Sequence, residues 1–303
     1  MPDEHDATNP SPMGEVPGAA LPAELTRHIG YTLRRVFVLL GSDAAGADEA
    51  ATRDFVLLDA LADGDSLSQH DLAERLGINR TVMVQLIDRL EGDGRVTRTR
   101  NPRNRRSYVL SLTDSGRRAL EELRRSVAER DARLTAPLSE PERERFDLLL
   151  GRLLPAQAQP IPRSTSYLVT QAHYRLRKVG DDKLAGTGLR LRHFGPLSTI
   201  NVHSSCAQRQ LAEHLAITEP AAAQVVDELV RAGLVRRGRD PRDRRRYALE
   251  LTDRGRESLK TVERAVEDLQ SDIEEMLGPG GETELKNFLF KILEYANATA
   301  DVR

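Results

Sequence analysis

Apolar residues recur along the first half of the chain at the three- and four-residue spacing of amphipathic helices. Leu25, Ile29, Leu33, Val36 and Leu40 form one such stripe. Six helices are predicted in this way, over residues 26–40, 51–62, 67–78, 80–91, 115–134 and 141–154. Two stretches alternate between apolar and polar residues, which predicts strands over 95–100 and 107–113 around a turn at 101–104. The predicted order is four helices, a two-stranded hairpin and two further helices.

Capping residues support these boundaries. Asn79 is a natural N-cap for the helix that follows it, and Gly94 marks the end of that helix. Thr113 and Asp114 stand where the long charged helix begins, and both residue types accept hydrogen bonds from the free amides of a first turn.

The chain contains this pattern twice. The sequence LAERLGIN at 72–79 returns as LAEHLAIT at 211–218, and NPRNRRSYVLSLTDSG at 101–116 returns as DPRDRRRYALELTDRG at 240–255. Both pairs are offset by 139 residues, and 22 of the 46 aligned positions in this region are identical. Composition alone predicts matches at about 5–7% of positions. The repeat therefore indicates two copies of one domain in tandem.

Proline-rich segments separate these copies. Residues 1–22, which hold several Pro together with Gly, Asp, Asn and Ser, predict a disordered tail, and PAQAQPIP at 155–162 predicts a stiff linker. The two domains are then expected at 23–154 and 163–300.

Composition narrows the class of protein without fixing its function. The 303 residues include 30% charged and 4% aromatic residues and no Trp, which is typical of a helical protein. One Cys excludes an intrachain disulfide framework and a Cys-based zinc module. No apolar run reaches the length of a membrane span, and no secretory signal is visible, so a cytoplasmic location is expected.

Two short helices followed by a two-stranded hairpin predict a winged helix-turn-helix, whose second short helix enters the major groove of DNA. The predicted hairpin at 95–106 holds six Arg and no acid, and that at 236–246 holds seven Arg beside Asp240 and Asp243. A single run of Arg is often only a solvated face. Two runs at the same place in two copies favour contacts with a DNA backbone, and the net charge of −2 does not oppose this because the acids lie elsewhere.

The region from Leu72 to the helix after the hairpin resembles the MarR family of bacterial transcriptional regulators, and so does its second copy. The second copy carries the family's wing motif as Asp243-Arg244-Arg245 followed by LTDRG at 251–255. The first copy has Asn101 and Asn104 at the positions of Asp240 and Asp243. The resemblance implies that this acid orients a neighbouring Arg, so Asn104 is expected to leave Arg105 and Arg106 less fixed.

The resemblance implies a mainly α fold with small β-hairpin wings, in the α+β class, with two winged helix-turn-helix domains joined through a helical layer like a dimerisation layer. Its implied partner is double-stranded DNA with a pseudo-palindromic or asymmetric operator. The expected DNA-binding residues of the first copy are Asn79, Arg80, Thr81, Gln85, Arg98, Arg100, Arg103, Arg105 and Arg106. Those of the second copy are Thr218, Gln224, Arg237, Arg239, Arg242, Arg244 and Arg245.

The helix that is expected to enter the major groove, here called the recognition helix, differs between the two copies. Glu219 and Pro220 stand where the first copy has Arg80 and Thr81. Pro220 fits the first turn of a helix, whereas Glu219 is unfavourable beside phosphate but can accept a hydrogen bond from cytosine. An asymmetric operator is therefore expected.

Two assemblies are open. Family members are dimers, so the two copies can pair within one chain as a pseudo-dimer, which the short linker favours. The alternative is a homodimer of chains with four winged domains.

Effector, metal, redox and catalytic sites have weaker support in the sequence. The resemblance implies a small aromatic or anionic effector between the dimerisation layer and the winged domain. The candidate lining residues, each of which is more often simple core, are His28, Tyr31, Phe55, His173, Tyr174, His193 and Phe194. The spacing of His193, His203, Cys206 and His214 fits no standard zinc site, and no metal or cofactor is expected. Cys206 is expected to be a small buried residue rather than a redox sensor. No catalytic motif stands out, so an enzyme is not expected.

Gly195-Pro196 interrupts the second predicted helix of the second copy, where the first copy has Val56-Leu57. A kinked helix is the simple expectation, and a reshaped effector pocket is the functional one.

Two functions remain open at this stage. The first is a sequence-specific DNA-binding transcriptional regulator, expected to be a repressor relieved by a small ligand. The second is an interaction protein that retains the fold without binding an operator. The weak recognition helix of the second copy favours the second function, and the thirteen Arg of the two wings favour the first.

Overall fold

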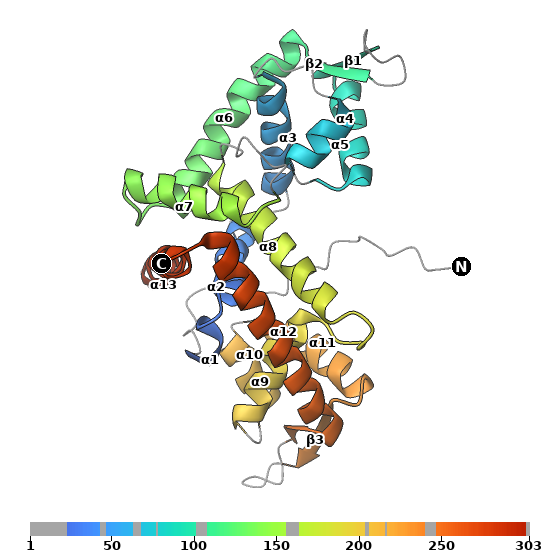
Figure 1. Ribbon diagram of the computed structural model, residues 1–303, viewed down its shortest axis with the longest axis vertical. Helices are drawn as coiled ribbons and strands as arrows, with labels where there is room; N and C mark the ends of the chain where they lie inside the picture. The colour runs from blue at the N-terminus through green and yellow to red at the C-terminus, as the bar shows by residue number, and fades with distance from the viewer. Residues whose placement is uncertain are drawn as a thin grey trace, which may run out of the picture. The chain divides into compact units, whose positions relative to one another are not determined.

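The computed structural model describes residues 23–42, 47–62, 68–76, 78–100, 108–155, 164–203, 206–215, 217–239 and 247–300. The first sequence copy forms α1 (Ala23–Thr26), α2 (Ile29–Ser42), α3 (Ala47–Ala62), α4 (Gln69–Leu76), α5 (Arg80–Gly92), β1 (Val96–Arg100), β2 (Tyr108–Leu112), α6 (Asp114–Leu134) and α7 (Glu140–Arg152). The second copy forms α8 (Thr165–Lys183), a 3₁₀ turn (Leu191–His193), α9 (Phe194–His203), α10 (Gln208–Leu215), α11 (Glu219–Arg231), β3 (Val235–Arg239), β4 (Tyr247–Leu251), α12 (Asp253–Leu277) and α13 (Gly281–Ala300) (Figure 1).

The expected α+β fold class is confirmed, and the duplication is visible in the elements themselves. The pairs α4/α10, α5/α11, β1/β3, β2/β4 and α6/α12 each begin 139 residues apart. Both hairpins are antiparallel and keep the same register, with Val96 opposite Leu112 in one and Val235 opposite Leu251 in the other. The two copies therefore form the same winged helix-turn-helix.

Two sequence expectations about helices are wrong. The first helix does not run unbroken from residue 26, because α1 ends at Thr26 and α2 begins at Ile29. The second predicted helix of the second copy is not kinked at Gly195-Pro196. Instead α9 begins at Phe194, directly after the 3₁₀ turn, so Pro196 lies in the first turn, where its missing N–H leaves no intrahelical hydrogen bond unmade.

The chain divides into two compact units that cut across the sequence copies. Among the described residues, the β1–β2 unit comprises 32–177 and 271–295, and the β3–β4 unit comprises 23–31, 178–270 and 296–300. The β1–β2 unit thus contains the start of α8 and most of α13, which belong to the second copy. The β3–β4 unit contains α1, which belongs to the first copy.

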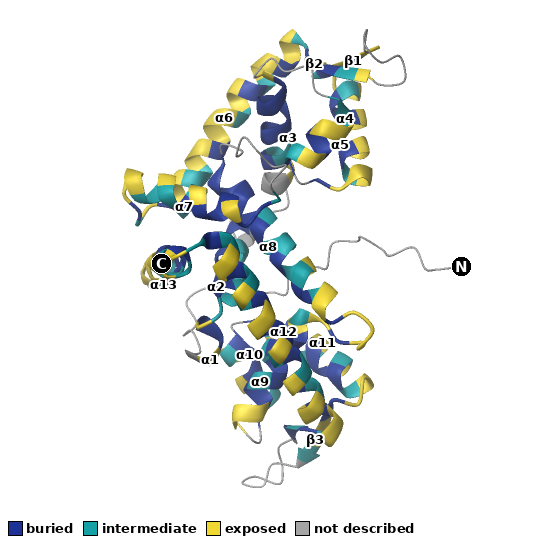
Figure 2. Ribbon diagram, viewed as in Figure 1, coloured by how far each residue is buried: buried dark blue, intermediate teal, exposed yellow. Residues whose placement is uncertain are grey.

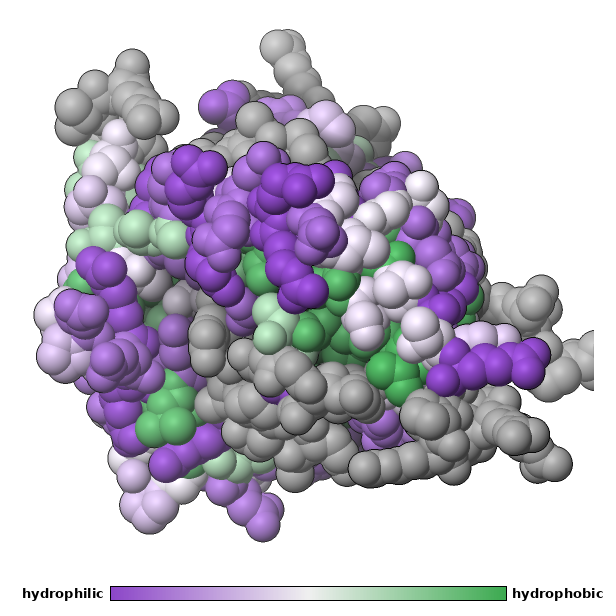
Figure 3. Space-filling view, turned by 90° about the horizontal axis from the view of Figure 1, so that it is seen from above, coloured by the Kyte–Doolittle hydropathy of each residue, from purple (hydrophilic) through white to green (hydrophobic). Residues whose placement is uncertain are grey.

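Each unit has a core built around its helix-turn-helix. In the β1–β2 unit, Leu72 of α4, Met83 and Ile87 of α5 and Leu120 of α6 are buried together with Tyr167 of α8. Helix α3 is buried over much of its length, whereas the outer side of α6 is exposed (Figure 2). On the face seen in Figure 3, hydrophilic side chains cover most of the described surface, with smaller hydrophobic patches between them. Because Tyr167 belongs to the second sequence copy, that copy contributes to the core of the first winged domain.

The β3–β4 unit shows the reciprocal arrangement. Its core joins Leu211 of α10, Val226 of α11 and Val262 of α12 to Leu25 of α1. Each winged domain is thus completed by an apolar side chain from the other copy.

Helices of both copies also pack together within the β1–β2 unit. Arg145 of α7 forms an ion pair with Glu284 of α13 at 2.7 Å, and the rings of Phe146 and Phe288 meet edge to face, 6.1 Å apart. Arg145 and Glu284 are separated by 139 residues and are therefore equivalent positions of the repeat. A contact between equivalent positions is what a local pseudo-twofold relation between α7 and α13 produces.

The first helices of the two copies meet in the same unit. Phe37 of α2 stacks on the ring of His173 of α8 at 4.4 Å between centroids. Burial, together with the nearby Arg34 and Arg177, lowers the pKa of His173 to about 3, so this half-buried imidazole is neutral at physiological pH and packs as an aromatic ring.

A glycine fixes the junction between each hairpin and the long helix that follows it. Thr113 caps α6 by accepting from the Gly116 amide at 3.0 Å and donates to the Gly94 carbonyl at 2.6 Å. A Cβ on Gly116 would lie 2.0 Å from the carbonyl oxygen of Arg95, and one on Gly255 would lie 2.0 Å from that of Leu234. Only glycine permits this close approach of two backbones.

We expect Gly116→Ala and Gly255→Ala each to lower the free energy of unfolding by about 2–3 kcal/mol, because a backbone must move to make room for the methyl group. Gly30→Ala is the matched control, since a Cβ placed on this residue of α2 would have no atom within 4 Å. That substitution should change stability by less than about 1 kcal/mol and in the stabilising direction. Urea denaturation followed by circular dichroism measures all three, and equal midpoints for Gly116→Ala and the control would contradict the packing argument.

Candidate nucleic-acid interface

Helix α5 presents one apolar and one polar face. Met83, Leu86, Ile87 and Leu90 are buried against the core of the winged domain. The opposite face exposes side chains at helical spacing: Arg80, Thr81, Val84, Gln85 and Asp88. The helix begins at the predicted N-cap, Asn79, whose side-chain oxygen accepts from the Thr81 amide at 2.8 Å. Helices α4 and α5 lie beside the β1–β2 hairpin, as the recognition elements of a winged helix do (Figure 1).

Helix α11 exposes a less basic face. Thr218 caps it by accepting from the Ala221 amide, and Pro220 lies in its first turn. Ala221 and Ala222 are buried, which leaves Glu219 and Gln224 among the exposed polar residues. The predicted contrast between Arg80 and Glu219 is thus a contrast between two exposed positions.

An ion pair ties each recognition helix to its wing. Arg98 of β1 pairs with Asp88 of α5 and, at 2.9 Å, with Glu91. Arg237 of β3 pairs with Asp227 of α11 at the equivalent positions of the second copy. Both Arg residues were expected to bind DNA, and in the structure each is paired with a carboxylate of the helix beside its hairpin. Arg100, at the end of β1, is exposed.

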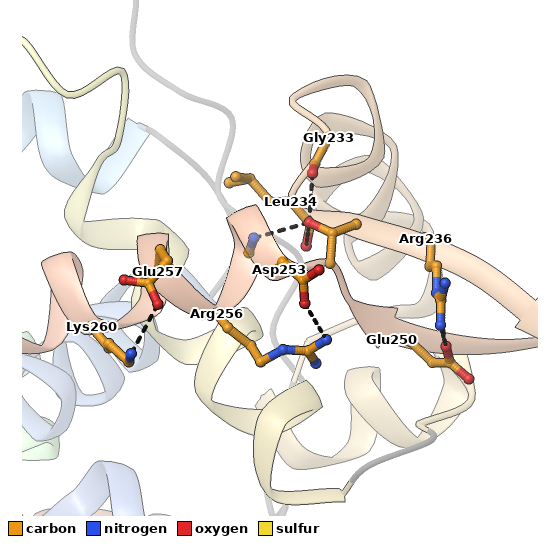
Figure 4. A network of polar contacts seen from close by, with 10 residues as sticks. Gly233, Leu234, Arg236, Glu250, Asp253, Arg256, Glu257 and Lys260 are labelled. Carbon is orange, nitrogen blue, oxygen red and sulfur yellow. Dashed lines mark hydrogen bonds and ion pairs between the residues drawn. The ribbon is translucent and has the colours of Figure 1, made fainter.

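Further polar contacts lie at the second hairpin and at the start of α12. In the second copy Arg236 and Glu250 pair across the strands at 2.7 Å, and Arg256 pairs with Asp253 at 2.9 Å. Thr252 donates to the Gly233 carbonyl at 2.7 Å, just as Thr113 does to Gly94 (Figure 4). The base of the hairpin is therefore fixed where it leaves the long helix.

A second contact connects α5 to α3 and α11 to the 3₁₀ turn before α9, and the carboxylate comes from α3 in the first copy but from α11 in the second. In the first copy Arg89 of α5 pairs with the buried Asp54 of α3, and this hydrogen bond raises the pKa of Arg89. In the second copy the equivalent residues are Glu228 and His193, whose Nε2 lies 3.1 Å from the carboxylate, with Arg192 at 2.6 Å. Burial alone would raise the pKa of Glu228, but the hydrogen bonds from Arg192 and His193 lower it overall.

The wing tips lie outside the described residues. Arg103, Arg105 and Arg106 of the first copy, and Arg242, Arg244 and Arg245 of the second, fall at 101–107 and 240–246, as do the Asn and Asp residues of the wing motif. Arg239 ends β3, and its side chain is not described.

Two exposed apolar side chains were not anticipated from the sequence. Val84 lies on the outer face of α5, and Tyr108 lies on β2 opposite Arg100, with 40% and 51% of their surfaces exposed. The sequence could have identified Val84 as exposed, because it lies three residues after Thr81 and residues at that spacing share one face of a helix. An exposed methyl group on a recognition helix is suited to contact with the methyl group of thymine.

The residues predicted to bind an effector separate into two groups. His28, Tyr31, His193 and Phe194 belong to the β3–β4 unit, where His28 packs edge-on against Phe194 at 5.3 Å. Phe55, His173 and Tyr174 belong to the β1–β2 unit, where Tyr174 and His173 pack around Phe37. Phe55, His193 and Phe194 are buried and the other four are half-buried, and the contact with Glu228 gives His193 a structural role.

A small polar cavity of about 10 Å³ lies among α3, α6 and α8 in the β1–β2 unit. Its lining residues are Thr52, Arg53, Arg130, Ser166, Tyr167, Thr170 and Gln171. This volume holds about one water molecule, and none of the seven predicted effector residues lines it.

Cys206 is buried next to the second hairpin. Its amide donates to the Leu249 carbonyl and its own carbonyl accepts from the Leu249 amide, so it extends the hairpin by one bridge. Burial, with a contribution from Glu213, raises the pKa of the thiol to about 11. The protonated, buried thiol is a poor nucleophile, which agrees with a packing role.

Two other kinds of site are absent from the described residues. These residues contain no group of three or more His, Cys, Asp or Glu side chains arranged to hold a metal ion. Within the same ranges, every helix is too short or too polar to cross a membrane.

Both winged domains match models of one family. Residues 52–108 and 187–246 each match a model described as MarR family. A Thauera aromatica protein, whose name connects it with transcriptional regulation of the hcr operon, is 34% identical over 97 residues, covering 32% of this chain and 58% of that protein. The HTH-type transcriptional repressor Mb2911 of Mycobacterium bovis is 29% identical over 128 residues, covering 41% of this chain and 92% of the repressor.

Among solved structures, the transcriptional repressor CouR bound to a 23-mer DNA duplex is similar to this chain at 29% identity and a TM-score of 0.39, covering 42% of this chain and 91% of CouR. The names of these relatives are those of transcriptional regulators.

Proposed function

We propose that this chain, a MarR-family transcriptional regulator with two family domains in tandem, binds one operator with its two winged helix-turn-helix units as a pseudo-dimer. The observation that carries the proposal is the repeated framework of α5 with β1–β2 and of α11 with β3–β4. In both copies a polar helix face and an Arg-bearing hairpin are held together by the same Asp–Arg ion pair.

The mechanism follows from this framework. Helices α5 and α11 enter successive major grooves, and the Arg-rich hairpins contact phosphates beside them. The ion pairs of Arg98 and Arg237 fix the distance between groove-reading helix and wing before DNA arrives, so less conformational entropy is lost on binding.

The proposed pairing of the copies within one chain is supported inside the β1–β2 unit. There α7 and α13 contact each other through Arg145–Glu284 and through Lys291–Glu142, and α2 contacts α8 through Phe37 and His173. These are the first and last helices of the two copies, the elements that family resemblance assigns to dimerisation. The alternative is a homodimer of chains with four winged domains.

The proposed operator is asymmetric. The first copy offers Arg80, Val84 and Gln85 to the bases, and the second offers Glu219 and Gln224. The half-site bound by the first copy, here called the first half-site, is therefore expected to supply most of the base-specific affinity.

Regulation is proposed to be repression, relieved by a small aromatic or anionic ligand, as the family resemblance implies. Because chromosomal DNA is the proposed partner, a cytoplasmic location is proposed as well. The competing function is an interaction protein that retains the fold without binding an operator, and the next experiment distinguishes the two.

Removal of Arg residues from the wings should weaken binding to every duplex. For Arg103→Ala with Arg105→Ala, and separately for Arg242→Ala with Arg244→Ala, the slope of log affinity against log salt should fall by about 1 for each phosphate that is no longer paired. Fluorescence anisotropy over a salt series measures both quantities. The control, Arg125→Ala with Arg133→Ala, removes the same charge from exposed positions of α6 and should leave the slope unchanged. Binding of neither random nor selected duplexes by the unmodified protein would favour the interaction protein.

Base reading is expected to differ between the half-sites. Gln85→Ala should reduce discrimination in one half-site by about 1–3 kcal/mol, because alanine cannot form the bidentate hydrogen bonds that an amide makes to a base. Gln224→Ala should act on the other half-site, and less strongly. Sequencing of duplexes selected by each variant locates the effect. Equal effects on both half-sites from either variant would instead place identical chains on the two halves.

The assembly is expected to be a pseudo-dimer, which should sediment at equilibrium with the mass of one chain, 33.7 kDa, at micromolar concentration. Pairing through a short linker is favoured because the effective local concentration is about millimolar. Footprinting should then show one chain protecting half-sites about 34–36 Å apart. A mass of two chains that persists on dilution to nanomolar concentration would support the four-winged homodimer.

A further inference from the structure

Tyr167 lies where the second sequence copy meets the helix-turn-helix of the first. The residue is in the first turn of α8, and its side chain is 1% exposed within the core of the β1–β2 unit. Its hydroxyl donates to the carbonyl oxygen of Leu76 at 2.5 Å. Burial raises the pKa of this phenol, so the group remains a hydrogen-bond donor at any physiological pH.

The acceptor is the last residue of α4. The final carbonyl groups of a helix have no amide partner within the helix and need one elsewhere. Leu76 is only three residues before Asn79, which caps the recognition helix α5, and the amide of Ile78 bonds back to the Ala73 carbonyl at 3.0 Å. The Tyr167 hydroxyl therefore holds the end of α4 directly before the turn into α5.

The start of α8 is itself fixed to the first copy. Asp131 of α6 accepts from the amides of Thr165 and Ser166, at 3.0 and 2.9 Å, and from the Ser166 hydroxyl. Thr165 also donates to Asp147 of α7 at 2.7 Å. Tyr167 is thus carried on a helix end that is anchored at two points, so its hydroxyl has a defined position relative to α4.

The equivalent position in the other copy has different chemistry. His28 lies 139 residues before Tyr167. Its Nε2 accepts from Arg27 at 3.0 Å, and its ring packs against Phe194. A Tyr-to-carbonyl bond of this kind is therefore specified by the sequence of one copy and not by the fold alone.

We propose that Tyr167, a residue of the second copy, is a positioning residue for DNA reading by the first copy. It fixes the α4–α5 turn so that Arg80, Val84 and Gln85 meet the major groove together. The inference rests on the proposed function, since it assigns Tyr167 a part in operator binding. It also makes the first reading unit dependent on the helix layer that joins the copies.

The test is Tyr167→Phe in the full chain, which removes the hydroxyl and keeps the ring. Tyr295→Phe is the matched control, because it removes a hydroxyl from a half-exposed tyrosine of α13 in the same unit. Hydrogen exchange followed by mass spectrometry compares peptides covering 72–82 and 211–221 without DNA. Anisotropy then compares duplexes that carry only the half-site read by Gln85 or only the half-site read by Gln224.

We expect faster exchange at 72–82 but not at 211–221, and affinity about 3- to 10-fold weaker on the first half-site alone, as removal of one hydrogen bond to a buried carbonyl predicts. Tyr295→Phe should change neither. Faster exchange with unchanged affinity, or equal weakening on both half-sites, would overturn the positioning role, and unchanged exchange would overturn the proposed hold on the turn. If the unmodified chain binds no duplex, the proposed function fails, whereas the exchange experiment still decides whether Tyr167 holds the turn.

Discussion

The core of each winged domain is completed by a side chain from the other sequence copy. Tyr167 closes the core around α4 and α5, and Leu25 closes the core around α10 and α11. A single copy of this length would leave those core positions open to water, at a cost of about 25 cal/mol for each Å² of apolar surface exposed. Mutual completion of the two cores explains why the compact units do not coincide with the sequence copies.

The ion pairs show what the duplication has kept and what it has changed. The pairs Asp88–Arg98 and Asp227–Arg237 are the same in both copies, since each holds a wing to its recognition helix. The contact of α5 with α3, between Arg89 and Asp54, is replaced in the second copy by contacts of Glu228 with Arg192 and His193. Both copies thus pair a cation with a carboxylate at this place, while the exposed faces of α5 and α11 have diverged.

The electrostatics of the chain are local. The net charge of −2 describes no particular surface, because acids and bases are distributed unevenly along the sequence. Several Arg residues near the recognition helices are neutralised by carboxylates, including Arg89, Arg98 and Arg237. In the proposed complex, attraction for DNA depends chiefly on the other Arg residues of the two wing sequences, whose pairing with phosphate would release counterions.

The sequence alone determined the repeat, the helix-turn-helix with its hairpin, the caps at Asn79 and Thr113, and the polar outer face of the first recognition helix. These features are local: they follow from periodicity, from capping chemistry and from an identical offset between copies. Only the tertiary structure decided that Arg98 is held in an ion pair, that the His173 imidazole is neutral, and that Tyr167 bonds to the end of α4. Most of those contacts join residues far apart in the chain, and burial, which sets their chemistry, depends on which helices pack together.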